Sequence, residues 1–163
     1  GSAVPTSTGS IGNTFTLFKK LRLYALVDWK RGNRLANAID QLRCQGLTGV
    51  GLCDINYHPN KYSAVQVAEA SISAYVNQAD DQFFQDASFV KLREVSATYS
   101  LPDRLIPGVR HASFTLAARE LHIWTKYTGP DPEVNDAPTG LIAQDQAVLP
   151  PLSRFIATLN LTF

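Results

Sequence analysis

The sequence predicts an all-β protein built as an antiparallel meander of about five long strands. Two observations carry this prediction. Apolar and polar residues alternate along several stretches, which is the two-residue repeat of a β-strand, and short turns separate some of these stretches. The clearest stretch ends the chain, SRFIATLNLTF, where one parity holds Phe155, Ala157, Leu159, Leu161 and Phe163.

A hairpin is predicted first, within IGNTFTLFKKLRLYALVDWKRG, residues 11–32. Phe18, Lys19 and Lys20 form its short turn. One face of the hairpin is apolar and the other polar, as in a sheet with two different environments. The apolar parities hold Ile11, Phe15, Leu17, Leu21, Leu23, Ala25, Val27 and Trp29, and the polar parity of the second strand holds Arg22, Tyr24, Asp28 and Lys30.

Two further strands are predicted in the middle of the chain. In FVKLREVSATYSLP, residues 89–102, Val95, Ala97 and Tyr99 alternate with polar residues until Pro102 ends the ladder. In SFTLAARELHIWTKYT, residues 113–128, the apolar parity changes after Ala118. This change predicts a β-bulge near Arg119 and Glu120.

The connections between strands alternate in length. Residues 33–88 and 129–151 form long insertions, whereas the other links are short. The first insertion contains two helical patterns, and Ser63 is placed to cap the second one. The patterns consist of Leu35, Ala38, Ile39 and Leu42, and of Val65, Ala68, Ile72, Tyr75, Val76 and Ala79. We expect these apolar faces to pack within the protein rather than to bind a partner.

Composition and strand length indicate which surroundings the predicted sheet could have, namely nucleic acid, membrane or water. The net charge of +1 and the pI of about 8.0 give no electrostatic case for nucleic acid. No run of about 18 apolar residues offers a transmembrane helix, but strands of roughly ten residues are long enough to cross a bilayer when tilted. Alternating short and long connections are typical of outer-membrane β-barrels. A soluble β-sandwich that binds carbohydrate or protein remains the alternative.

Three motifs stand out, namely QDASFVKLREVSATYSLP, LHIWTKYTGPDPEVN and the terminal SRFIATLNLTF. Together they resemble the closing part of the barrel of SusC/RagA-type TonB-dependent outer-membrane receptors, and residues 1–37 resemble an earlier hairpin of this barrel more weakly. The resemblance implies a bacterial outer-membrane barrel of about 22 strands with a plug. Residues 1–163 would be its C-terminal part, with 33–88 and 129–151 as external loops, and upstream residues would encode more strands and the plug.

The same resemblance implies a function in nutrient uptake. The intact receptor would import glycan or peptide oligomers with a SusD-like surface lipoprotein and the TonB complex, and the fragment alone would transport nothing. Its terminal strand would close the barrel against outer-membrane lipid. Phe155, Leu159 and Leu161 would face that lipid, and Phe163 would be the aromatic end that the barrel-assembly machinery reads.

No catalytic motif accompanies these strands, so we expect neither an enzyme nor a cofactor. Cys44, Cys53 and His58 do not match a zinc-ligand spacing, so no metal site is predicted. The carboxylates Asp131, Glu133 and Asp136 could gather calcium, but GPDPEVND is first of all a turn-rich loop.

Two groups of residues are left as candidates in the expected external segments. Cys44 and Cys53 lie close together in one segment and are predicted to form a disulfide in the oxidising envelope. The aromatic residues divide by position. Trp29, Trp124 and Tyr127 are predicted at the membrane interface, and Tyr57, Tyr62 and Tyr75 are candidates for stacking on a sugar ligand.

Overall fold

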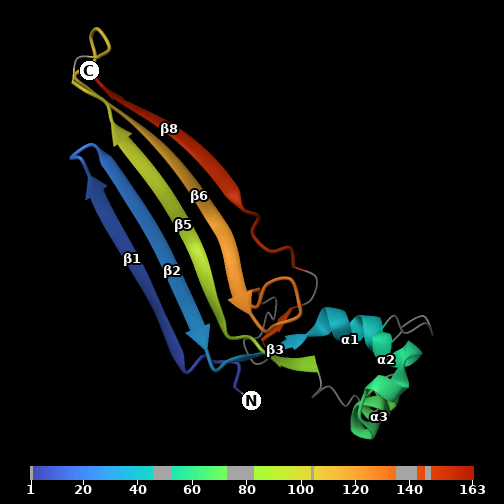
Figure 1. Ribbon diagram of the computed structural model, residues 1–163. Coiled ribbons are helices and arrows are strands. Elements are labelled where there is room, and N and C mark those ends of the chain that lie inside the picture. Colours follow the sequence, from blue (N-terminus) through green and yellow to red (C-terminus); the bar gives the residue numbers. More distant parts are fainter. Residues whose placement is uncertain (1, 46–52, 73–82, 104, 135–142, 146–147) are drawn as a thin grey trace. The chain divides into compact units, whose positions relative to one another are not determined.

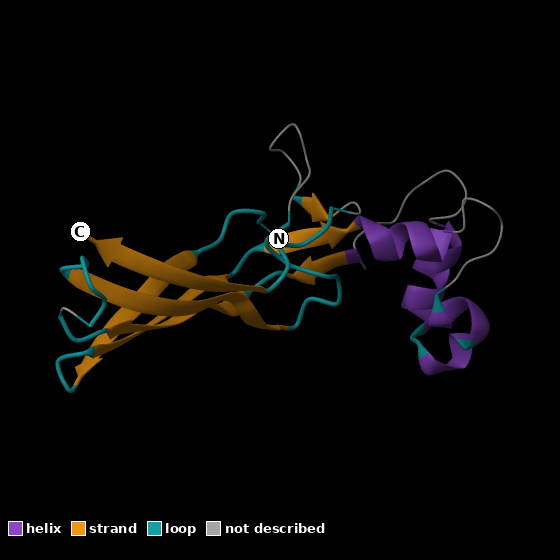
Figure 2. Ribbon diagram, turned by 90° about the horizontal axis from the view of Figure 1, so that it is seen from above, coloured by secondary structure: helices purple, strands orange, loops and turns teal. Residues whose placement is uncertain are grey.

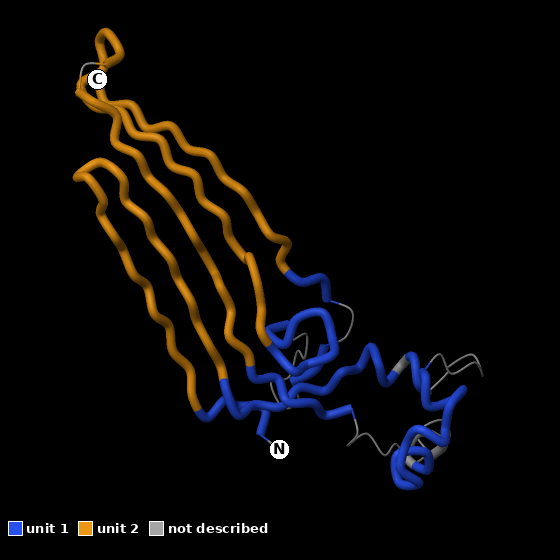
Figure 3. The backbone as a smooth tube through the Cα atoms, in the orientation of Figure 1, with its two compact units in different colours: residues 1–6, 31–88, 125–150 blue, residues 7–30, 89–124, 151–163 orange. Residues whose placement is uncertain are grey.

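The computed structural model describes residues 2–45, 53–72, 83–103, 105–134, 143–145 and 148–163. The chain divides into two compact units (Figure 3). Unit 1 comprises Gly1–Thr6, Arg31–Ser88 and Thr125–Pro150, and unit 2 comprises Ser7–Lys30, Phe89–Trp124 and Pro151–Phe163. The long predicted strands therefore form one unit, and the predicted insertions form most of the other.

Unit 2 is a five-stranded sheet whose strands follow one another in sequence order (Figure 1). The strands are β1 (Ser7–Leu17), β2 (Leu21–Arg31), β5 (Phe89–Ser100), β6 (His111–Thr125) and β8 (Arg154–Thr162). The pairs β2–β5 and β6–β8 are antiparallel. The predicted meander of five long strands is confirmed, with each strand close to its expected range.

The register of the strands gives this sheet one apolar and one polar face. On the first face Leu23 is paired with Ala97 and Ala25 with Val95, whereas the alternate pair Tyr24 and Ser96 lies on the second face. Strands β6 and β8 continue the pattern. Their apolar pairs are Ala112–Leu161, Phe114–Leu159, Leu116–Ala157 and Ala118–Phe155, and their polar pairs include Ser113–Asn160 and Thr115–Thr158.

Two irregularities interrupt the sheet near its middle. Leu26 is opposite Glu94 and Val27 is opposite Leu92, so Arg93 is an extra residue on β5. On β6, Glu120 adopts a φ of 53°, next to Arg119, where the pairing with β8 ends. The irregularity predicted at Arg119 and Glu120 is present, and the one at Arg93 was not predicted.

The turn between β1 and β2 also follows the prediction. The Lys20 amide donates to the Leu17 carbonyl at 3.1 Å, which closes the turn around Phe18 and Lys19. Both central residues have left-handed backbones, with φ of 51° and 59°. A tight link of this kind suits the right-handed twist of paired strands.

Unit 1 contains a small sheet that the sequence did not indicate. Its order is β4 (Phe84–Asp86), β3 (Arg34–Asn37) and β7 (Gln144–Asp145), with β3 antiparallel to β4 and parallel to β7. Leu35 lies in β3, so the prediction that Leu35 begins a helix is wrong. The Ala36 amide bonds to the Ala143 carbonyl at 2.9 Å, which holds this segment in a sheet.

The helices of unit 1 lie in the first insertion (Figure 2). They are α1 (Ala38–Gln45), α2 (Asp54–Tyr57), the 3₁₀ turn η1 (Pro59–Lys61) and α3 (Ala64–Ile72). The Asn37 side chain caps α1 by accepting from the Asp40 amide at 3.0 Å.

The cap predicted at Ser63 is confirmed. The Ser63 hydroxyl accepts from the Gln66 amide at 3.3 Å, and the Gln66 side chain accepts from the Ser63 amide at 3.0 Å. The predicted helical positions Tyr75, Val76 and Ala79 lie outside the described residues. Within the described ranges, no helix combines the length and the hydrophobicity that crossing a bilayer requires.

Candidate functional site

The apolar face of the unit 2 sheet is a broad exposed surface. On β8, Phe155 is 81% exposed and Leu159 is 58% exposed, and Phe163 beyond the strand is 77% exposed. Large apolar side chains on β1, β5 and β6 are exposed as well. They are Ile11, Phe15 and Leu17 on β1, Val95 and Tyr99 on β5, and Phe114 and Leu116 on β6.

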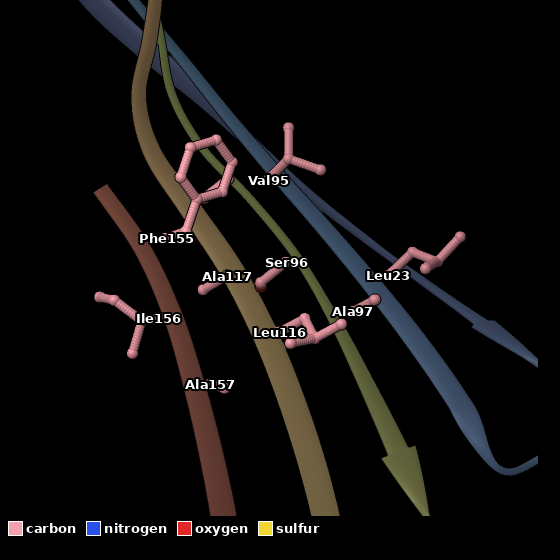
Figure 4. A pocket seen from close by; sticks show the side chains of 10 residues that line it. Leu23, Val95, Ser96, Ala97, Leu116, Ala117, Phe155, Ile156 and Ala157 are labelled. Carbon is pink, nitrogen blue, oxygen red and sulfur yellow. The ribbon is translucent and has the colours of Figure 1, made fainter. Parts of the chain in front are cut away.

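A hollow of about 380 Å³ is set into this face (Figure 4). Larger residues from four strands line it on this face, namely Leu23, Val95, Leu116 and Phe155. Alanines at positions 97, 118 and 157 leave the room between them. Such a hollow suits a hydrocarbon chain, because its walls offer packing surface and almost no hydrogen-bonding groups.

An apolar face with exposed large side chains on β1, β5, β6 and β8 is unusual for a soluble monomer. Soluble monomers rarely expose a continuous apolar patch of more than a few hundred Å². The alternation along β8 places every apolar residue from Phe155 to Leu161 except Ile156 on this one face. The apolar face is therefore the candidate functional surface of unit 2, and it fits contact with an apolar phase.

The polar face carries an ion-pair cluster around the two irregularities. The extra residue of β5, Arg93, donates to Asp28 on β2 at 2.8 Å and to Glu120 on β6 at 3.2 Å. The ammonium of Lys91, whose side chain is almost fully buried, lies 3.4 Å from Glu120. Arg119 and Glu94 form a further pair at 2.8 Å.

The cluster is electrically balanced, because its three basic and three acidic residues cancel. Buried charges are tolerated when they are paired and hydrogen-bonded. The bulges make the pairing possible, since they bring charged residues from adjacent positions of a strand to the same face. The run of charged residues next to the change of parity is the sequence signal that could have predicted this cluster.

The aromatic residues predicted at a membrane interface have different surroundings. The Trp29 ring lies against Gly9 of β1, in space that a side chain at Gly9 would fill. Trp124 is exposed and meets His122 edge-on, with ring centroids 4.5 Å apart. Tyr127 is buried in the core of unit 1 with Leu35 and Ala87. The interface role of these residues stays a prediction.

Tyr127 takes part in a buried polar contact that sequence reasoning missed. Its hydroxyl donates to Asp145 of β7 at 3.1 Å. Burial raises the pKa of the Tyr127 phenol, and the neighbouring Asp145 carboxylate raises it further. The contact joins the segment after β6 to the small sheet.

The tyrosines proposed for ligand stacking do not line the hollow on the apolar face. Tyr57 is exposed, and the Tyr62 hydroxyl donates to Asp54 at 3.1 Å. The hydrogen bond from His58 to Asp54, followed by the one from Tyr62, lowers the pKa of the Asp54 carboxyl. Tyr75 lies outside the described residues. Their role in binding remains untested.

Cys44 of α1 and Cys53 are joined as a disulfide in the structure, with Cα atoms 4.8 Å apart. This Cα separation lies within the usual range for a disulfide. The formation of the bond in the mature protein stays a prediction.

The acidic loop shows a turn rather than a gathered set of carboxylates. The Asp131 side chain accepts from the Glu133 amide at 2.9 Å, which is a local turn contact. Asp136, the third member of the predicted acidic group, lies outside the described residues.

Comparison with solved structures relates the whole chain to one kind of transporter. A RagAB peptide transporter matches with a TM-score of 0.75 and 26% sequence identity, and a closed-closed RagAB peptide importer matches with 0.74 and 25%. The importer in its open-open state matches with 0.75 and 23%. Each match covers 99% of this chain. The chain has the fold of part of a SusC/RagA-type receptor.

The chain covers 18% of the length of each matched SusC/RagA-type chain. No protein-family model matches it, and no curated protein matches it either. The sequence resemblance to SusC/RagA-type receptors thus agrees with an independent similarity of structure that extends over both units.

Proposed function

We propose that this chain forms the C-terminal wall of a TonB-dependent importer in the bacterial outer membrane. The observation that carries the proposal is the division of the unit 2 sheet into one exposed apolar face and one polar face with paired charges. In a transmembrane barrel the apolar face contacts lipid and the polar face lines the interior. The alternative soluble sandwich would have to cover the apolar face with protein.

The outer strands of the sheet support a role within a larger barrel. Strands β1 and β8 each have one neighbour in the described sheet. In hydrocarbon, every unpaired backbone amide or carbonyl on such an edge costs several kcal/mol. Strands from the rest of the receptor would pair with both edges, and the terminal strand β8 would close the barrel.

The cargo and the partners follow from the same proposal. The matched structures are of peptide importers or transporters, so a peptide oligomer is the favoured cargo and a glycan oligomer is the second choice. The intact receptor would act with a SusD-like lipoprotein and the TonB complex, after the barrel-assembly machinery inserts it. The chain contributes wall and loops to this transport and performs no enzymatic step.

Substitutions on adjacent residues of β8 test this proposal. Leu159 is opposite Phe114 on the apolar face, and Thr158 is opposite Thr115 on the polar face. In the full receptor, Leu159→Arg should destabilise the barrel by about 2 to 4 kcal/mol near the bilayer midplane, and Thr158→Arg by much less. Deletion of Phe163 should reduce insertion without reducing synthesis. Heat-modifiable gel mobility of receptor in outer membranes measures the folded fraction of each variant.

The comparison of Leu159→Arg with Thr158→Arg distinguishes a barrel wall from a soluble sandwich. Equal tolerance of the two arginines, with normal folding after loss of Phe163, would contradict the barrel and favour the soluble sandwich.

A further inference from the structure

We propose that a small pocket on the polar face of unit 2 binds an aspartate or glutamate side chain from a segment of the intact receptor outside these 163 residues. The pocket has a volume of about 240 Å³. Strands β1, β2 and β5 line it with polar side chains only, namely Thr14, Arg22, Tyr24, Ser96 and Thr98. This site is separate from the ion-pair cluster around Arg93.

Arg22 gives the pocket an uncompensated positive charge. In the part of the chain that the structure describes, no acidic group lies within ion-pair distance of its guanidinium. Arg93 on β5 and Arg119 on β6 contrast with it, because each contacts a carboxylate at 2.8 Å. Arg22 therefore provides a cation for a group that these residues do not supply.

The residues that line this pocket favour a carboxylate group as the ligand. A guanidinium binds a carboxylate through two parallel hydrogen bonds, which makes the pair both strong and directional. The hydroxyl groups of Thr14, Tyr24 and Ser96 can donate to the same oxygens. The Thr98 hydroxyl is already hydrogen-bonded to that of Thr115 at 2.9 Å, so one wall of the pocket is fixed in place.

The size of the pocket favours a side chain over a free ligand. Pockets that hold whole small molecules usually have volumes of about 300 to 1,000 Å³, and this one is smaller. The chain covers only 18% of the matched receptor chains, so a large part of such a receptor is available to supply the acid. The inference rests on the proposed function, because that function makes the polar face the inside of a closed barrel.

A photo-crosslinking amino acid at the position of Tyr24 tests the occupant directly. In the full receptor in outer membranes, we expect a crosslink to one segment of the receptor that contains Asp or Glu, identified by mass spectrometry. The same probe at Tyr99, on the apolar face, serves as the control and should not capture that segment. Arg22→Ala should abolish the Tyr24 crosslink, whereas Arg110→Ala, in the turn before β6, should leave it unchanged.

A charge exchange then tests the ion pair. Arg22→Glu should lower the folded fraction in heat-modifiability gels, and replacing the captured acid by Arg should restore it. Capture of an imported peptide, absence of any captured acidic segment, or a crosslink that survives Arg22→Ala would overturn the inference while the barrel stands. A receptor that does not insert at all would overturn the proposed function and this inference together.

Discussion

Tyr127 illustrates how single buried side chains organise unit 1. Its ring packs with Leu35 and Ala87, and its hydroxyl reaches the fully buried Asp145 of β7. A sequence pattern gives no sign of this contact, because Tyr127 and Asp145 lie 18 residues apart in an irregular region. The predicted interface role of Tyr127 rests on its position after a long strand, and that role stays a prediction.

Replacing Tyr127 by Phe should loosen unit 1 while keeping the ring. The change leaves the buried Asp145 carboxylate without this donor, which should cost about 1 to 3 kcal/mol. Limited proteolysis of the full receptor at pH 8 should therefore cut residues 31–88 roughly ten times faster or more. Tyr57→Phe, at an exposed tyrosine, is the control and should not change the rate.

The same residue gives unit 1 an alkaline pH dependence. Because the folded pKa of Tyr127 is raised above its ordinary value of 10.0, the stabilisation by the neutral phenol is complete below pH 10 and is lost as pH rises through the folded pKa. Proteolysis of the parent receptor should accelerate above pH 10 by more than that of Tyr127→Phe. Identical pH profiles of the two proteins would contradict the assignment.

At the scale of elements, the strands that could be predicted are those with one apolar face. Alternation over 9 to 15 residues located β1, β2, β5, β6 and β8, because one parity must avoid water along the whole strand. The strands β3, β4 and β7 have 4, 3 and 2 residues, too few for a period to appear. They form through long-range pairing, which is why the helical pattern predicted at Leu35 is wrong.

The Cys44–Cys53 disulfide leads to a prediction for the helical insertion. Cys44 and Cys53 are separated by 9 positions, and closing a loop of this size should stabilise the segment by roughly 2 to 3 kcal/mol. In receptor isolated under oxidising conditions and denatured, neither thiol should react with a maleimide until reductant is added. A Cys44→Ser/Cys53→Ser variant provides the unlabelled control. Labelling of both cysteines before reduction would show that the bond is absent.

At the scale of the whole molecule, one chain forms two compact units of different structure. Unit 2 is a sheet of long strands, and unit 1 combines a small sheet with short helices. In unit 2, one face of the sheet is apolar, and the other is polar and carries paired charges. The apolar face could be predicted from sequence, but the ion pairs on the polar face could not. They depend on which strands are neighbours and on the irregularities at Arg93 and Glu120, next to which Asp28 pairs with Arg93, Lys91 with Glu120 and Glu94 with Arg119.

The central claim is that the apolar face of the sheet contacts lipid in the intact receptor. The most direct measurement is the accessibility of nitroxide spin labels, placed one at a time on cysteines at residues 157–161 in the Cys44→Ser/Cys53→Ser receptor. In membranes, labels at Ala157, Leu159 and Leu161 should collide strongly with oxygen and weakly with a water-soluble nickel chelate. Labels at Thr158 and Asn160 should show low oxygen collision. Loss of this two-residue alternation, or free access of the chelate to Leu159, would contradict the account.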